Sequence, residues 1–146
     1  MDIRTRGKLT ILRGLPASGK STFAKTWVEE HPSNRVIVCR DSIRRSLGPY
    51  WIPTREKLVT EIEELMVLNA MFNINDEDYC FDIVLDATNF KGLDKWKEFA
   101  EFYSYEFEIK DFTDVPLEEC IKRDELREHK VGQKVIEGFY NKYLNK

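Results

Sequence analysis

Cysteine is scarce in this chain of 146 residues, and no apolar run approaches the length that spans a membrane. Cys39, Cys80 and Cys120 are odd in number and show no C-x-x-C spacing, which argues against a disulfide framework and against a zinc site. Residues 1–6 contain no apolar signal core. These absences predict a protein of the reducing cytoplasm that has no membrane partner.

Positive charge is not in excess either, because 23 lysines and arginines stand against 26 aspartates and glutamates. The net charge of −3 disfavours proteins that coat long stretches of nucleic acid, which are usually basic. Any polynucleotide partner should therefore be bound locally, at an end. The length and a hydrophobic content of 42% predict one globular domain over residues 1–146. The sequence does not indicate the oligomeric state.

Residues 14–21 read G-L-P-A-S-G-K-S, which is a complete G-x-x-x-x-G-K-S phosphate loop. An apolar strand candidate precedes it at residues 9–12, and a helical pattern follows at 21–30, as the motif requires. A chance glycine turn before a helix is the weaker alternative. Lys20 is expected to reach the β- and γ-phosphates of ATP or another nucleoside triphosphate, and the Ser21 hydroxyl to ligate Mg²⁺. The residues predicted to bind the nucleotide are Gly14, Leu15, Pro16, Ala17, Ser18, Gly19, Lys20, Ser21 and Thr22.

Apolar segments of strand length recur at residues 36–39, 83–85 and 106–112, and the last alternates as an edge strand does. Helical patterns occupy residues 54–74, 93–103, 116–127 and 135–144. This alternation predicts an α/β fold with a mainly parallel sheet of four or five strands and helices on both faces. In the longest helix, the expected buried face consists of Leu58, Ile62, Leu65, Met66 and Phe72.

Ligands in such folds bind beyond the carboxyl ends of the strands, so the residues that follow each strand are candidates for chemistry. Asp41 follows the second strand and is flanked by Arg40 and Arg44, whose positive charge is expected to keep it ionised. One interpretation makes Asp41 a helix N-cap. The other makes it the general base toward an attacking hydroxyl, while an arginine holds an acceptor phosphate.

Two further groups allow similar alternatives. Asp86 closes the third strand and is either a Walker-B acid that supports Mg²⁺ or part of a turn, together with Thr88. Arg123 and Arg127 lie four residues apart among acidic side chains. They belong either to a surface helix with ion pairs or to a lid that brings positive charge onto the transferring phosphoryl group.

In chain order, these groups resemble the kinase domain of phage-type 5′-hydroxyl polynucleotide kinases. The likeness spans roughly residues 8–144, and its motifs are the phosphate loop, Arg40-Asp41 with Arg44, Asp86-Ala87-Thr88-Asn89, and Lys122-Arg123 with Arg127. The resemblance implies a P-loop kinase-like three-layer sandwich with a helical lid.

The same resemblance implies a role for each matching residue. Lys20 and Ser21 would bind ATP and Mg²⁺, and Asp41 would be the general base toward the 5′-hydroxyl of DNA or RNA. Arg44 would hold the phosphate on the 3′ side of the acceptor nucleotide. Asp86 and Thr88 would lie beside the acceptor, and Arg123 and Arg127 would cover the donor phosphates.

Three questions stay open at this point. Asp86 could orient Arg44 instead of supporting the metal. The acceptor could be a nucleoside, sugar, antibiotic or nucleotide-sugar, although a neutral small acceptor would leave Arg44 without a phosphate to hold. A third alternative is an ATP-binding module that transfers nothing and therefore needs no base at Asp41.

Overall fold

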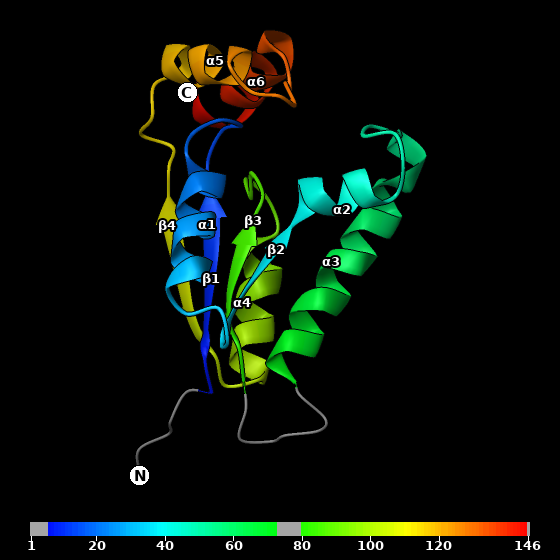
Figure 1. Ribbon diagram of the computed structural model, residues 1–146, viewed down its shortest axis with the longest axis vertical. Helices are drawn as coiled ribbons and strands as arrows, with labels where there is room; N and C mark the ends of the chain where they lie inside the picture. The colour runs from blue at the N-terminus through cyan, green and yellow to red at the C-terminus, as the bar shows by residue number, and fades with distance from the viewer. Residues whose placement is uncertain (1–5, 73–79, 146) are drawn as a thin grey trace.

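A computed structural model of the protein describes residues 6–72 and 80–145. At its centre is a parallel sheet with the strand order β2-β3-β1-β4 (Figure 1). The strands are β1 (Lys8–Arg13), β2 (Arg35–Cys39), β3 (Asp82–Asp86) and β4 (Glu106–Asp111). The predicted α/β class and the parallel sheet are confirmed, and the alternating segment is the edge strand β4.

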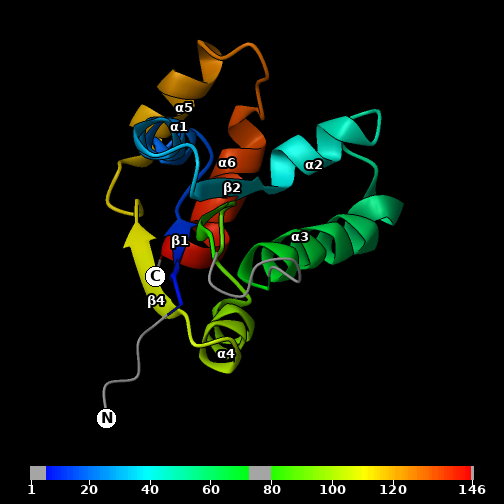
Figure 2. The same ribbon diagram turned by 60° about the horizontal axis from the view of Figure 1, so that its bottom comes forward.

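Helices cover both faces of this sheet, which makes three layers (Figure 2). Alternate residues of the central strands point to opposite faces, so Leu12 and Val84 pack against one layer and Leu9 and Ile83 against the other. The helices of these layers are α1 (Lys20–Glu30) on the first face, and α3 (Glu56–Met71) and α4 (Leu93–Phe102) on the second.

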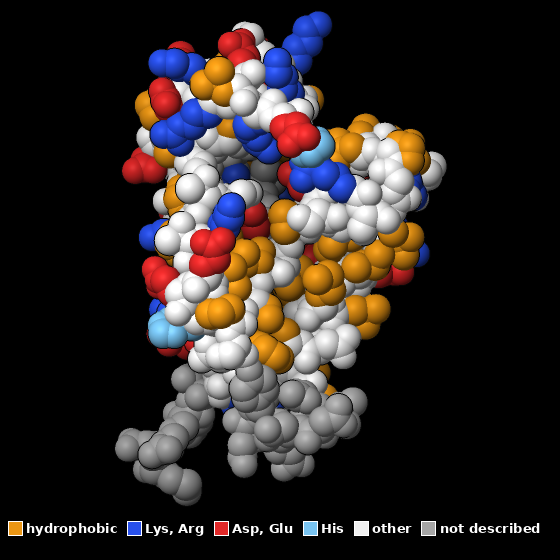
Figure 3. Space-filling view, in the orientation of Figure 1, with side chains coloured by type: hydrophobic (Ala, Val, Ile, Leu, Met, Phe, Trp, Pro, Cys, Tyr) orange, Lys and Arg blue, Asp and Glu red, His pale blue; other side chains and the backbone are white. Residues whose placement is uncertain are grey.

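The predicted buried face of the long helix is wrong except at Ile62, which is partly buried against the core. Helix α3 follows a short 3₁₀ turn, η1 (Pro53–Arg55), and buries the stripe Val59, Glu63, Val67 and Met71. The side chains expected in the core are largely exposed: Leu58, Leu65, Met66 and Phe72. Orange side chains on the face between α1 and α3 are visible in Figure 3. Residues 73 and 74, the expected end of this helix, lie outside the described residues.

A separate helical unit lies over the carboxyl edge of the sheet (Figure 1). It consists of α5 (Leu117–Glu125), α6 (Gln133–Phe139) and a π-helical end, η2 (Tyr140–Leu144). Its own apolar cluster joins Cys120 and Ile136 to Leu15 of the phosphate loop. The unit therefore packs on the phosphate loop and, through Phe90, on the segment that follows β3. None of the helices in residues 6–72 and 80–145 has the length and hydropathy of a membrane-spanning segment.

Candidate active site

The phosphate loop joins β1 to α1, and its shape depends on two glycines. A side chain at Gly14 would lie 2.9 Å from both Phe112 Cβ and Ser18 Oγ, so only glycine fits there. Gly19 has φ +105° immediately before the helix, and Ala17 also lies in the left-handed region at φ +64°. Such a backbone turns successive N–H groups inward and forms a concavity that suits phosphate oxygens.

Lys20 is folded into this loop and only 6% exposed. Its Nζ donates hydrogen bonds to Leu15 O at 2.6 Å, Gly14 O at 3.0 Å and Ser18 Oγ at 3.3 Å. Burial lowers the pKa of Lys20 to about 8, although the charge of Asp86 opposes this shift. The ammonium is thus held by two carbonyl groups and a hydroxyl, and a phosphate would give it a stronger partner.

Asp86 ends β3, where it is in register with Leu12 of β1 and Cys39 of β2. Its Oδ2 accepts a hydrogen bond from Ser21 Oγ at 2.7 Å. Asp86 is 6% exposed, and this burial raises its pKa. The arrangement matches a Walker-B acid beside a phosphate-loop serine. The bonds of Arg44 run instead to Asp41 and Glu56.

The Ser21 and Asp86 pair offers only oxygen donors, which suits Mg²⁺. The described part of the chain contains no cluster of three or more His, Cys, Asp or Glu side chains that could enclose a metal. Magnesium commonly keeps several waters and binds through one or two protein groups plus substrate phosphates. The residues present therefore fit a Mg²⁺ ion that arrives with a nucleotide.

Asp41 lies in the first turn of α2 (Arg40–Ser46), directly after β2. It is not the N-cap, because that position is Cys39 and no side chain caps the helix. Instead, Asp41 Oδ1 accepts hydrogen bonds from Arg44 Nη1 at 2.7 Å and from Tyr50 Oη at 2.8 Å. The Asp41 side chain is 33% exposed. Its carboxylate is thus held at the sheet edge and remains open to a ligand.

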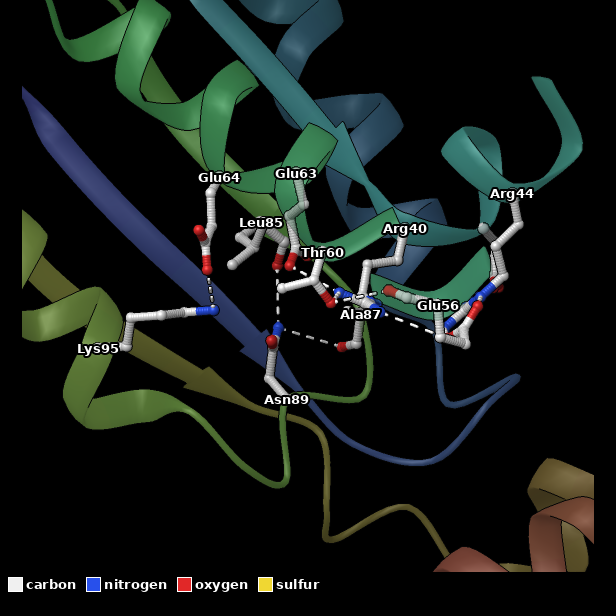
Figure 4. A network of polar contacts seen from close by, with 11 residues as sticks. Arg40, Arg44, Glu56, Thr60, Glu63, Glu64, Leu85, Ala87, Asn89 and Lys95 are labelled. Atoms are coloured by element: carbon white, nitrogen blue, oxygen red, sulfur yellow. Dashed lines mark hydrogen bonds and ion pairs between the residues drawn. The ribbon is translucent and has the colours of Figure 1, made fainter. Parts of the chain in front are cut away.

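Arg44 is fixed by Glu56 in a two-pronged contact, with Nε to Oε2 at 3.0 Å and Nη2 to Oε1 at 2.6 Å. These interactions raise the pKa of Arg44 despite its partial burial. Arg40 differs from the expectation, because it turns away from Asp41 toward α3. There it bonds to Glu63 at 2.9 Å, to Thr60 at 3.1 Å and to Glu56 at 3.4 Å (Figure 4). Of the two arginines that flank Asp41, Arg44 is the one paired with it.

Three residues of this group were not anticipated from the sequence. Glu56 and Glu63 are seven residues apart on one side of α3 and face the two arginines, a spacing that could have revealed them. Tyr50 follows α2 in a loop, and no sequence signal indicates its contact with Asp41. Burial and the nearby Asp41 charge raise the pKa of Tyr50 to about 12, so this hydroxyl stays a donor at neutral pH.

The two lid arginines lie near the phosphate loop. A side chain atom added at Gly19 would be 3.8 Å from Arg123 Nη1, so Arg123 extends over the loop, while its Nε pairs with Glu119 at 3.0 Å. Arg127 is 3.6 Å from Asp124, and its charge contributes to the lowered pKa of Lys20. Basic side chains gather around the hollow beneath this lid in Figure 3. Arg123 thus has an ion pair on its own helix and also faces the loop.

The segment after β3 ties the site together. Thr88 O accepts a hydrogen bond from Gly14 N at 3.1 Å, and Asn89 Nδ2 donates to Leu12 O at 2.6 Å. Asn89 is 8% exposed and has φ +51°, a conformation that asparagine tolerates better than most residues. Asn89 thus locks the end of β3 to β1, and Thr88 lines a cleft of about 340 Å³ beside the loop.

Comparison with known proteins agrees with this geometry. A family model described as an AAA domain matches residues 9–143. L-seryl-tRNA(Sec) kinase of Methanococcus maripaludis is 29% identical over 141 residues, covering 92% of this chain and 52% of that protein. The chain therefore spans about half the length of this curated relative.

Solved structures of a kinase and of an RNA repair complex are also similar to this chain. A chain of the Pnkp1/Rnl/Hen1 RNA repair complex is similar with a TM-score of 0.76 and 28% identity, covering 99% of this chain and 46% of that chain. A second Pnkp1/Rnl/Hen1 structure gives 0.64 and 29%, covering 89% and 42%. A gluconokinase from Sinorhizobium meliloti 1021, at 0.55 and 14% identity, covers 93% and 74% and shares the fold alone.

Proposed function

We propose that this chain, which belongs to the AAA domain family and is an ATP-binding P-loop kinase, transfers the γ-phosphate of ATP to the 5′-hydroxyl end of a polynucleotide. The observation that carries the proposal is the pairing of Asp41 with Arg44 at the edge of the sheet that holds the phosphate loop. A carboxylate for an incoming hydroxyl and a guanidinium for an acceptor phosphate are then supplied together.

On the donor side, the backbone N–H groups of residues 14–19 would bind the ATP phosphates, and Lys20 would leave its carbonyl partners to contact the β- and γ-phosphates. Ser21 and Asp86 would hold Mg²⁺, which neutralises charge on the phosphates. Arg123 and Arg127 would approach the transferring group from the lid. Positioning and charge stabilisation of this kind account for most of the catalysis of phosphoryl transfer.

On the acceptor side, Asp41 would accept the proton of the 5′-hydroxyl as that oxygen bonds to the γ-phosphorus. The bond from the γ-phosphorus to the bridging oxygen breaks in the same transfer, and ADP leaves. Arg44 would hold the phosphate 3′ to the acceptor through the second N–H of Nη1 and of Nη2, because its bonds to Asp41 and Glu56 use Nε and one N–H of each Nη. Thr88 lies at the same edge and would contact the acceptor.

A second candidate acceptor is the seryl hydroxyl of a charged tRNA. The relative that phosphorylates L-seryl-tRNA(Sec) supports it, since the match extends over 92% of this chain. The Pnkp1/Rnl/Hen1 complex is one of RNA repair and supports a nucleic-acid end instead. Both acceptors present a hydroxyl on an anionic polynucleotide, so they must be separated by experiment.

The test supplies labelled ATP and Mg²⁺ with a panel of acceptors: 5′-hydroxyl RNA and DNA oligonucleotides, their 5′-phosphorylated twins, nucleosides, nucleoside 3′-monophosphates and seryl-tRNA. We expect label only on acceptors with a free 5′-hydroxyl, and better transfer to a 3′-monophosphate than to the matching nucleoside, because Arg44 needs a phosphate. Lys20→Ala, which removes the phosphate-loop lysine, should lose the label. Label on the seryl group or on a nucleoside alone would refute the proposal.

A further inference from the structure

A loop of residues 47–52 joins α2 to η1 beside the active site (Figure 1). In this loop, Tyr50 Oη donates a hydrogen bond to Asp41 Oδ1 at 2.8 Å. The next residue, Trp51, has its ring centroid 5.5 Å from Arg44 Cζ. Two consecutive residues of one loop therefore contact the carboxylate and the guanidinium that the proposed transfer requires.

The two oxygens of Asp41 have different surroundings. Oδ1 accepts hydrogen bonds from both Tyr50 Oη and Arg44 Nη1. A carboxylate oxygen has about two lone-pair sites, so these two donors occupy both of them. No group in residues 6–72 and 80–145 donates a hydrogen bond to Oδ2, and the side chain is 33% exposed. Oδ2 is therefore the oxygen that an acceptor hydroxyl can reach.

The loop that carries Tyr50 is fastened by a separate residue. The Arg55 guanidinium donates hydrogen bonds to two loop carbonyl groups, Leu47 O and, at 2.9 Å, Pro49 O. Because these bonds hold the backbone, the loop does not need the Tyr50 hydroxyl to keep its shape. The contact of that hydroxyl with Asp41 therefore acts mainly on the direction of the carboxylate.

The Tyr50 hydroxyl is a donor and not a second base. Burial and the charge of Asp41 raise the pKa of Tyr50 to about 12, so the phenol keeps its proton at neutral pH. The Arg45 guanidinium lies over the Tyr50 ring, with Cζ 5.3 Å from the centroid, and this cation–π contact helps to hold the ring. Tyr50 can thus orient Asp41 but cannot replace it in removing a proton.

We propose that Tyr50 is a positioning residue for phosphoryl transfer, which holds Asp41 Oδ1 together with Arg44 so that Oδ2 receives the proton of the acceptor hydroxyl. This inference rests on the proposed function. As the hydroxyl oxygen bonds to the γ-phosphorus, its proton passes to Oδ2 and ADP leaves. With Arg44 as its one donor, the carboxylate would be free to rotate about a single hydrogen bond. Oδ2 would then lose its fixed direction, and a small misplacement of a reacting group is enough to slow catalysis.

The test is single-turnover transfer of label from ATP to a 5′-hydroxyl oligonucleotide, for wild type and for Tyr50→Phe, which loses only the hydroxyl. We expect the rate constant at saturating substrates to fall about tenfold. The concentrations of ATP and oligonucleotide that give half the maximal rate should change by less than about twofold, because Tyr50 contacts neither the phosphate loop nor the free N–H groups of Arg44. Tyr103→Phe is the control, since Tyr103 follows α4 at the opposite edge of the sheet, and it should leave all three values unchanged.

A double variant identifies the residue through which Tyr50 acts. If Tyr50 works by orienting Asp41, its hydroxyl has no base to orient once Asp41→Asn is present. Tyr50→Phe should then change the residual transfer rate of Asp41→Asn by less than about twofold. A residue that only supports the structure would slow transfer by the same factor in both backgrounds.

The outcomes separate the two proposals. If wild type transfers no label to any polynucleotide, the proposed function fails. If wild type transfers label and Tyr50→Phe does so within about twofold of its rate, the positioning role is refuted while the function stands. Equal slowing by Tyr50→Phe in the wild-type and Asp41→Asn backgrounds would also refute that role. Circular dichroism of each variant establishes that it is folded.

Discussion

Burial of the Lys20 ammonium in the phosphate loop predicts that the protein, assayed without nucleotide, becomes more stable as the pH rises above neutrality. Lysine has an ordinary pKa of 10.5, and that of Lys20 is about 8. The unfolded chain therefore keeps this proton up to higher pH than the folded protein does. Between these two pKa values the unfolded state binds more protons, so the free energy of unfolding increases with pH.

The magnitude follows from the same pair of values. Each unit of difference in pKa corresponds to about 1.4 kcal/mol, so keeping Lys20 charged in the folded state costs about 3 kcal/mol. Integrating over the range from about pH 7 to about pH 9.5, where Lys20 loses its proton in the folded state only, gives a gain of about 2 kcal/mol. Lys20 is almost fully buried, so solvent screening reduces this value little.

The assay is urea unfolding of the nucleotide-free protein at several pH values, for wild type and for Lys20→Met. Other groups also titrate in this range, but they are common to both proteins and cancel in the difference between them. That difference should change by about 2 kcal/mol across the range, in the direction that favours wild type at higher pH. A difference that stays constant within about 0.5 kcal/mol would refute the argument that burial depresses the pKa of Lys20.

Three other predictions concern the neighbouring contacts. Glu56→Gln disrupts the two-pronged contact with Arg44, so it should raise the KM for a 5′-hydroxyl oligonucleotide about tenfold and leave the KM for ATP unchanged. Glu61→Gln is the control, and a change in the KM for ATP alone would contradict this role of Glu56. Asp86→Asn should raise the Mg²⁺ concentration for half-maximal transfer about 10- to 100-fold in a metal titration, whereas an unchanged titration would reject Asp86 as metal support. The buried Asp124 carboxylate accepts hydrogen bonds from two backbone N–H groups of the loop after α5. Asp124→Asn should therefore lower the free energy of unfolding, measured in urea, by about 1–3 kcal/mol, and a loss below about 0.5 kcal/mol would contradict this structural role.

Local sequence was sufficient for the parts of the fold in which neighbouring residues determine the geometry. The phosphate loop needs its glycines for backbone shape, and the central strands are apolar on both faces, so both features can be recognised from short segments. The carboxyl-edge location of Asp41 and Asp86 then follows from parallel topology.

Side-chain direction could not be predicted in the same way, because it depends on long-range partners. In α3 the more apolar stripe, which contains Leu65 and Met66, is exposed, whereas the buried stripe contains Glu63. A periodicity count treats Glu63 as a surface residue, but Arg40, at the start of α2, donates a hydrogen bond to its buried carboxylate. The same contact explains why Arg40 does not accompany Asp41.

The most direct test of the central claim is single-turnover transfer from labelled ATP to a 5′-hydroxyl oligonucleotide by Asp41→Asn, which keeps the shape of the side chain. Loss of the base should slow transfer by about 10²- to 10⁴-fold while ATP affinity is unchanged. Transfer within about threefold of the wild-type rate would contradict the assignment of Asp41 as the base for the incoming hydroxyl.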